Sequence, residues 1–369
     1  MFKQRIFATG LLAATISSAH ALPYGFYDAR SVAMGNVSVA TGGITTAALS
    51  NPGMLSVNET DDRFSLLLPA IGIQAIDDGN VIDLVDEYQE LENNQTPENI
   101  ERQVDILNEL DGASAIIGGI VNGAVVYSGD SFTWGVTVRG DAIVSAGLTN
   151  FDTNLADPTA DVTALGVLIT EIGLPVGTDF SVAGMQLSVG VTPKLVQLDA
   201  IEYNVSIENS DIEDIGDQNS EDLGSFTTLD AGVTLNIIDT FRVGLVAKNL
   251  IEETKYTSIG REINIDTHLR AGVAFDAGFM TLAADMDLTE RDPVASENPS
   301  KSLSIGAEIN TFEVFQLRAG YQTNMASGAT DPDLLSLGVG FWLGFHLDAA
   351  VVVGDDSSFG AFVQTGFRF

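Results

Sequence analysis

Two histidines in the second half of the sequence each lie two residues from an aspartate. His268 follows Asp266, and His346 precedes Asp348. Because residues at this spacing share one face of a β-strand, each carboxylate could orient its imidazole ring for acid–base catalysis. No serine stands out beside either pair as a nucleophile, and neighbours at this spacing commonly pair for structural reasons. We therefore predict ion-paired structural residues rather than a catalytic site, and a protein that is not an enzyme.

The sequence also gives little indication of a metal-binding site or of redox chemistry. The acidic run "DIEDIGDQNSED" at residues 211–222 offers the carboxylate oxygens that calcium prefers, but it lacks the alternating ligand-and-glycine register of a calcium loop. We read it as a solvated loop. The chain has no cysteine, which excludes thiol redox chemistry. We predict no cofactor and no metal site.

Charge and hydrophobicity indicate a protein with two kinds of surface. The formal net charge is −35, which makes nucleic acid an improbable partner because two polyanions repel each other. Yet 45% of the residues are hydrophobic, so the charged and apolar groups must be segregated.

The N-terminus has the features of a secretory signal at residues 1–21. Lys3 and Arg5 precede a short apolar segment, and Ala19-His20-Ala21 matches a small-x-small cleavage site. We expect the mature chain to begin near Leu22 and to be exported. No later stretch reaches about 18 uninterrupted apolar residues, the length needed for a transmembrane helix.

From about Phe226 onward the sequence is a series of segments about ten residues long that alternate with period two. In "FRVGLVAKNL", for example, Phe241, Val243 and Leu245 share one face. Each segment has one face free of charge and one that carries ionised groups. An arginine facing lipid costs about 2–4 kcal/mol near the bilayer midplane, so the charged face should be the lumen of a barrel. The lumen candidates are Arg242, Lys248, Asp266, His268, Arg270, Asp285, Asp287, Glu308, Arg318, His346, Asp348 and Arg368.

These segments predict an all-β protein, a transmembrane antiparallel β-barrel at residues 63–369. The segments are about as long as a tilted strand that crosses a bilayer, and a closed barrel leaves no unpaired edge in lipid. In the first half, residues 63–76, 113–127 and 132–148 are expected strands, and residues 185–207 form one long strand or two. The total is about 14 strands, with 12 and 16 open.

Two helical insertions are expected, near residues 81–111 and 160–173. The first has apolar residues at helical spacing, and Thr96 followed by Pro97 and Glu98 is a helix start. The second is shorter and more apolar. The helices either pack on the barrel rim or form a lid over the pore that would suit an apolar ligand; both alternatives are open.

Residues 22–62 lack alternation and are rich in small residues. In "DARSVAMGNVSVATGGITTAALSNPGM", Arg30, Gly35, Asn51 and Pro52 match the start of the FadL-type long-chain fatty-acid transporters, which this segment resembles. The resemblance implies a plug inside the barrel. The chain departs from that pattern at Asn36, where the family has a second glycine, and at Gly53, where it has alanine.

With stretches such as "FQLRAGYQTN" and "LLSLGVGFWLGFHLDAAVVVG", the last third looks like a group of exported barrels named TraF-like conjugal transfer proteins, which is related to the FadL family. The ending "FVQTGFRF" is similar to the terminal strand of outer-membrane proteins, in which Phe367 and Phe369 would serve assembly. The resemblances imply a Gram-negative outer-membrane location, with membrane lipid, lipopolysaccharide and the assembly machinery as partners. They imply either passive passage of a hydrophobic small molecule or, alternatively, a structural or interaction role in conjugal transfer.

Overall fold

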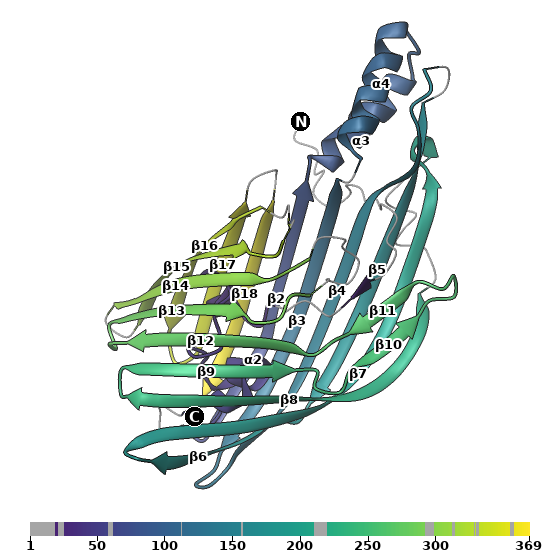
Figure 1. Ribbon diagram of the computed structural model, residues 1–369. Coiled ribbons are helices and arrows are strands. Elements are labelled where there is room, and N and C mark those ends of the chain that lie inside the picture. The colour runs from purple at the N-terminus through teal and green to yellow at the C-terminus, as the bar shows by residue number, and fades with distance from the viewer. Residues whose placement is uncertain are drawn as a thin grey trace.

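The strands of the protein form a closed barrel in the computed structural model. It describes residues 19–20, 26–57, 62–111, 113–155, 158–209, 220–291, 299–311, 314–327, 329, 332–354 and 358–369. In this part of the chain the strands close into an antiparallel ring of fourteen positions, which confirms the predicted fold and strand number (Figure 1). The first barrel strand, β2, pairs with the last, β18, so the sheet has no open edge.

Neighbouring strands in the ring follow one another in the sequence, except that β5 and β6 share one position between β4 and β7. Both pair with β4 and β7, and Leu174-Pro175 separates them. The strands are β2 (Phe64–Asp78), β3 (Ser114–Ser128), β4 (Thr133–Asp152), β5 (Thr159–Gly173), β6 (Val176–Val182), β7 (Met185–Ser206), β8 (Glu221–Ile238), β9 (Phe241–Lys248), β12 (His268–Asp276), β13 (Met280–Asp287), β14 (Ser302–Thr311), β15 (Phe315–Asn324), β16 (Leu334–Trp342), β17 (His346–Gly354) and β18 (Phe359–Arg368).

The barrel wall is uneven in height. Strands β2, β3, β4, β5, β7 and β8 are 15–22 residues long, whereas β9 and β12–β18 have 8–10 residues. We call these two parts the tall wall and the short wall; Figure 1 shows the tall wall rising beyond the short one. Since about 9–11 residues suffice to cross a bilayer, the upper part of the tall wall extends beyond the membrane.

The two ends of the barrel differ. At one end, which also holds the start of β2 and the end of β18, the connections between strands are two to four residues long, as at residues 129–132 and 239–240. At the other end lie the long connections, including residues 79–113 and 249–267. In outer-membrane barrels the short turns are periplasmic and the long loops extracellular. We call these ends the short-turn end and the long-loop end.

Aromatic residues ring the short-turn end. Phe64 stacks on Phe369 with a centroid separation of 5.9 Å and contacts Tyr127 at 4.9 Å. Phe367, on the terminal strand, contacts Phe345 at 5.9 Å. Such girdles lie at membrane interfaces, where one side of the ring is apolar and the other wet.

The predicted first insertion is a helical hairpin, α3 (Val81–Glu92) and α4 (Pro97–Glu109). Thr96 caps α4 by accepting a hydrogen bond from the Asn99 amide, as the sequence predicts. The hairpin packs on Ala146 and Leu148 of β4. Because these two residues lie on the same face of β4 as the half-exposed Trp134, the hairpin covers the outer face of the tall wall. It therefore packs beside the rim and does not form a lid over the lumen.

The predicted second helix is wrong, because residues 160–173 belong to strand β5. Residues 162–167 of this strand are buried on both faces, whereas Leu168 and Ile172, further along, are exposed on the outer face. Ala160 and Val162 pack under the helical hairpin on the outer face, whereas Val167 and Ile169 pack in the lumen. A strand covered on both faces is apolar throughout and shows no alternation, so its sequence is easily mistaken for a helix. The alternative at residues 185–207 is settled in favour of one strand, β7.

Three smaller pieces complete the fold. The hairpin of β10 (Glu253–Tyr256) and β11 (Glu262–Ile265), with β1 (Ala19–His20) beside β11, forms a sheet separate from the barrel. A turn of 3-10 helix, η2 (Ile207–Asn209), follows β7. Within the described residues, no helix is both long and apolar enough to cross a bilayer.

Candidate functional site

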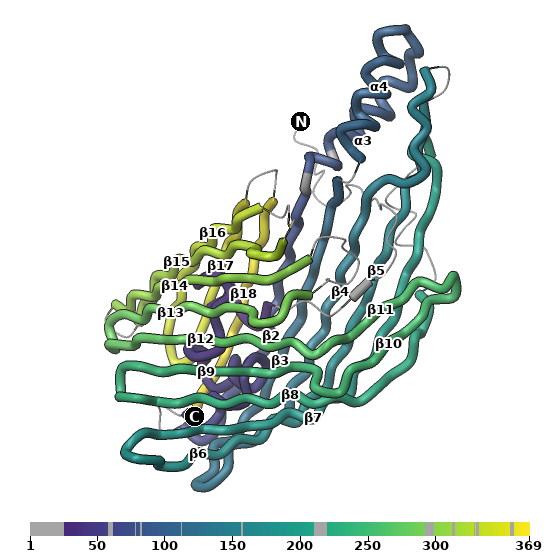
Figure 2. The backbone as a smooth tube through the Cα atoms, viewed as in Figure 1, coloured from purple at the N-terminus to yellow at the C-terminus, as the bar shows by residue number. Residues whose placement is uncertain are grey.

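Residues 26–57 lie inside the barrel and form the N-terminal plug. They contain α1 (Ala29–Ala33), α2 (Ile44–Ser50) and the 3-10 turn η1 (Pro52–Met54). Asp28 caps α1 by accepting a hydrogen bond from the Ser31 amide at 2.7 Å, and it also accepts one from the Thr46 hydroxyl on α2. This carboxylate ties the two helices together. Figure 2 shows the plug backbone, in dark purple, among the lower strands.

The Asn51-Pro52 motif of the plug has a structural role. Asn51 accepts a hydrogen bond from the Gly53 amide at 3.0 Å, which starts the 3-10 turn, and its Nδ2 donates to the Val39 carbonyl at 2.7 Å. Pro52 occupies the first position of that turn, where a missing N–H costs nothing. The motif thus fixes how the end of the plug folds back on its middle.

Glycines on the inner face of the barrel bring the plug backbone against the wall. A Cβ atom at Gly244 would lie 2.6 Å from the Val39 carbonyl oxygen, and one at Gly320 would overlap the backbone of Met34 and Gly35. Only glycine leaves room for such close approach. We call this set the glycine belt; its members are Gly190, Gly232, Gly244, Gly272, Gly306, Gly320 and Gly338, on β7, β8, β9, β12, β14, β15 and β16.

The local geometry of the plug explains both departures from the FadL pattern. Gly35 and Asn36 have left-handed φ values of +71° and +69°, a conformation that asparagine tolerates better than most residues. At Gly53 a Cβ atom would lie 2.5 Å from the Val233 nitrogen of the wall, so alanine would not fit.

A chain of ion pairs connects α1 to the short wall. Arg30 pairs with Glu308 through two contacts of 2.8 and 3.0 Å, Glu308 pairs with Arg318 at 2.6 Å, and Arg318 pairs with Asp348 at 2.5 Å. Gln364 then donates to Asp348 at 2.9 Å and accepts from the amide of Ala29, on the plug, at 2.6 Å. The chain begins and ends on the plug, so it fastens α1 from two sides.

A second cluster holds the middle of the plug. Arg270 is fully buried, lies 3.3 Å from Asp287 and donates to the Asn36 carbonyl at 3.2 Å. Asp285 accepts hydrogen bonds from the backbone amides of Ser38 and Val39 at 2.7 and 3.0 Å. The plug backbone here satisfies buried wall charges that would otherwise be costly.

A third cluster surrounds Tyr27, and the sequence did not reveal most of it. The Lys248 ammonium lies 4.6 Å from the Tyr27 ring centroid and donates to the Leu49 carbonyl at 2.7 Å. Burial raises the pKa of Tyr27, so the phenol stays neutral beneath the cation. The wall residues that extend this cluster and were not predicted are Arg139, Asp141, Glu171, Lys194 and Asp230.

The two His–Asp pairs do not form the arrangement needed for catalysis. The His268 Nε2 lies 3.1 Å from Asp287, on the neighbouring strand, and Asp266 precedes β12 instead of lying on it. The His346 ring contacts the Trp342 ring in a tilted arrangement with a centroid separation of 4.2 Å, and Asp348 belongs to the ion-pair chain. Among the described residues no cluster of three or more metal-ligating side chains occurs. The acidic run at 211–222 lies largely outside the described residues.

Below the plug, toward the short-turn end, a polar cavity of about 350 Å³ remains between plug and wall. Arg242 lies at its edge, 3.1 Å from Asp276, and Arg368 also lines it. Arg368 thus faces the lumen, while its neighbours Phe367 and Phe369 lie in the aromatic ring. The plug and its ion pairs thus occupy the lower lumen.

The upper lumen is different, because the inner face of the tall wall is apolar there. Val167 and Ile169 of β5 and Val196 and Leu198 of β7 are almost fully buried in one cluster, which Phe226 of β8 joins. They share the inner face with Glu171 and Lys194 lower on the same strands. We call these five residues the apolar patch. The barrel therefore has a charged lower lumen and an apolar upper one.

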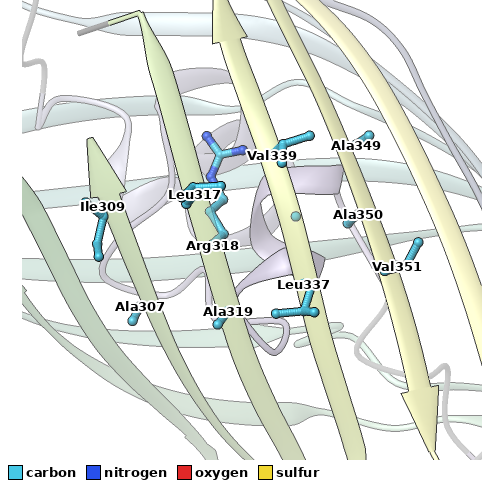
Figure 3. A pocket seen from close by; sticks show the side chains of 11 residues that line it. Ala307, Ile309, Leu317, Arg318, Ala319, Leu337, Val339, Ala349, Ala350 and Val351 are labelled. Atoms are coloured by element: carbon cyan, nitrogen blue, oxygen red, sulfur yellow. The ribbon is translucent and has the colours of Figure 1, made fainter. Parts of the chain in front are cut away.

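The outer face of the short wall carries an apolar hollow of about 570 Å³. Figure 3 shows it between β14 and β17, where Ala307, Ala319 and Ala349 lie among longer side chains such as Leu337. Since these residues face lipid, the hollow adds no path through the wall.

A family model described as "F plasmid transfer operon, TraF, protein" matches residues 48–287, more than half of the chain. The protein belongs to this TraF family. The match begins near the end of α2 and extends to the end of β13, so it includes the last ten residues of the plug, 48–57, and the whole tall wall. No curated protein matches the sequence significantly.

Solved structures similar to this TraF family member are channels of the FadL type, which confirms the predicted relationship in fold. The Ralstonia pickettii toluene transporter TbuX has a TM-score of 0.56 at 12% identity, covering 94% of this chain and 99% of that one. A Pseudomonas aeruginosa FadL homologue gives 0.53 at 12%, with 95% and 99% covered. The P. putida toluene transporter TodX gives 0.51 at 13%, with 93% and 98% covered.

Proposed function

We propose that this protein is an outer-membrane barrel that binds small hydrophobic molecules and lets them pass without catalysis or energy input. The apolar patch carries the proposal. A water-filled porin has a polar interior, whereas here Val167, Val196 and their neighbours form an apolar surface inside the barrel. The FadL-type fold, shared with proteins described as hydrocarbon channels, supports the same function.

We expect passage through this barrel to involve a movement, because the plug occupies the lower lumen. The ligand would bind at the long-loop end, and the plug would then shift or a gap in the wall would open. The proposal includes cleavage of the signal peptide at residues 1–21, insertion by the outer-membrane assembly machinery, and contact with membrane lipid and lipopolysaccharide.

A second candidate is a structural or interaction role in conjugal transfer. The description of the matched family model favours it, and a lower lumen occupied by the plug suits a protein that transports nothing. In that case the long loops at the long-loop end would contact a partner.

Uptake by cells separates the two functions. Labelled toluene and a labelled long-chain fatty acid are supplied to cells with and without the gene, at equal outer-membrane integrity. Transport requires that deletion lowers uptake of at least one probe and that the intact gene restores it. A variant lacking residues 22–62, checked for barrel assembly by its gel mobility with and without heating, tests the plug. Unchanged uptake of both probes combined with a mating defect would favour the interaction role.

A further inference from the structure

The β10–β11 hairpin lies over the apolar patch. Ile263 and Ile265 of β11 are fully buried, and both pack in the cluster that contains Val167 and Leu198 of the wall. The hairpin therefore places two branched hydrocarbon side chains on the surface to which we assign the hydrophobic ligand.

The hairpin belongs to no barrel ladder. Its two strands pair with each other in a sheet separate from the barrel, and β1, which also pairs with β11, lies in the segment 1–21 that the proposed function has cleaved. Its base is attached to β8, where the Leu250 amide donates to the Leu229 carbonyl at 2.9 Å and Ile251 exchanges hydrogen bonds with the Thr228 hydroxyl. The hairpin can thus swing away from the wall about its base without breaking any pairing of the barrel strands.

The tip of the hairpin is fastened by a few polar contacts. Thr257 donates to Glu202 of β7 at 2.9 Å, and the Ser258 amide donates to Glu221 of β8 at 2.9 Å. Arg261 lies 3.6 Å from Glu202, and its Nη1 atom is buried without a hydrogen-bond partner among the described residues. An incompletely satisfied guanidinium weakens the closed position.

We propose that the apolar patch is a binding site for a small uncharged hydrocarbon, and that the β10–β11 hairpin occupies this site as an internal competitor which the ligand displaces. Two isoleucine side chains have about the bulk of a single substituted aromatic ring. The acidic Glu202, on the same inner face, disfavours a ligand that carries a carboxylate. The inference rests on the proposed function, since it names the site and ligand class for it.

Hairpin movement can be followed directly, because the chain has no cysteine. Ile259, at the tip, is 73% exposed, so Ile259→Cys accepts an environment-sensitive fluorophore. Toluene added to the purified, full-length labelled protein should change the fluorescence saturably. With Val167→Thr and Val196→Thr, which keep the shape of the patch but make it polar, half-saturation should need about tenfold more toluene. With Ile263→Thr and Ile265→Thr, which weaken the competitor, it should need about tenfold less.

The matched control is Val191→Thr, which makes the same change on the outer face of β7, where Val191 is 43% exposed. It should leave half-saturation unchanged. If the patch and hairpin variants shift the curve in the same direction, or if Val191→Thr shifts it as much as they do, the inference is wrong. A response that does not saturate would also overturn it.

A second experiment locks the hairpin. A short bismaleimide joins Thr257→Cys to Glu202→Cys, and monofunctional N-ethylmaleimide on the same variant is the control. Locking should abolish the response to toluene and lower cellular uptake at least fivefold relative to the control. If uptake depends on the gene but is unchanged by locking, the proposed displacement of the hairpin is wrong, whereas the proposed transport function is supported. If toluene gives a saturable fluorescence response that the patch variant weakens, but the gene supports no uptake, the binding site is supported and the proposed transport function is wrong.

Discussion

Arg30 of the plug and Glu308 of β14 form a two-point ion pair, with Nε–Oε2 and Nη2–Oε1 separations of 2.8 and 3.0 Å. The two residues are 278 positions apart in the chain. Glu308 is also bound by Arg318, so one buried carboxylate serves one arginine from the plug and one from the wall. The pair makes the position of α1 depend on the short wall.

Replacing Arg30 with glutamine should loosen the plug. Removing one partner of a buried pair costs about 3–5 kcal/mol, and the lower end applies here because Arg30 is partly exposed and Arg318 still neutralises Glu308. Urea unfolding of the refolded protein in micelles measures the change. Arg63→Gln removes an exposed ion pair with Asp130 and should leave the free energy of unfolding almost unchanged. If the two variants lose the same free energy of unfolding, the Arg30–Glu308 pair stabilises the protein no more than an exposed ion pair does.

Adding one methyl group to the glycine belt should displace the plug. In Gly320→Ala the new Cβ atom would overlap Met34 and Gly35, whereas in Gly140→Ala it has 3.7 Å to its nearest neighbour. We expect Gly320→Ala to produce steady ion conductance in planar bilayers and faster proteolysis within residues 26–57. Gly140→Ala should stay closed. If Gly320→Ala shows no ion conductance and no faster proteolysis of the plug, the barrel wall rather than the plug has moved to make room for the methyl group.

Weakening the α3–α4 hairpin should cost stability but not change passage. Leu107→Ala removes a fully buried side chain and should destabilise the protein by about 2–4 kcal/mol. Because the hairpin packs on the outer face, toluene uptake per folded molecule should remain within twofold of wild type. Asn108→Ala, at an exposed neighbouring position, is the control for both measurements. A large gain in uptake from Leu107→Ala would revive the lid alternative.

The terminal phenylalanine should matter for assembly. The Phe369 side chain is 70% exposed and stacks on Phe64 at the rim of the barrel. Phe369→Ser should therefore have little effect on the stability of the folded barrel. If the terminal strand is read by the assembly machinery, the heat-modifiable barrel in outer membranes should fall severalfold. Phe279→Ser, at a similarly exposed aromatic position in a turn of the same end, should assemble normally. Equal loss in both would indicate a general need for rim aromatics.

The sequence predicted the parts of the fold in which one face is lipid and the other is polar. Strands β12–β18 alternate cleanly, and so Arg270 and Arg318 were assigned to the lumen, where the structure places them. The failure at β5 arose because the first half of this strand is buried on both faces and so has no such contrast. Alternation is thus informative only where the two faces meet different surroundings.

The contacts between plug and wall could not be predicted. Lys194 and Glu171 lie in strands whose inner faces are mostly apolar, so no repeat of charges marked them. The belt glycines are spread over seven strands, and a glycine in a strand is usually explained by a turn or bulge. Their shared role, contact with the plug backbone, becomes apparent only in the folded structure, where residues near position 35 lie against residues near position 320.

The closed ring and the enclosed plug together constrain the order of assembly. The plug comes first in the chain, but the glycines it contacts extend to Gly338, and the ring closes only when β18 joins β2. Once closed, the short wall leaves no lateral opening wide enough for a folded α1–α2 unit with its buried charges. We therefore expect the N-terminal segment to take its place while the sheet is still curling, before the last hydrogen-bonded seam, from Phe359↔Ala75 to Arg368↔Ser65, encloses it. Folding of this chain should be slow and should depend on long-range contacts, with closure of the final seam as the committing step.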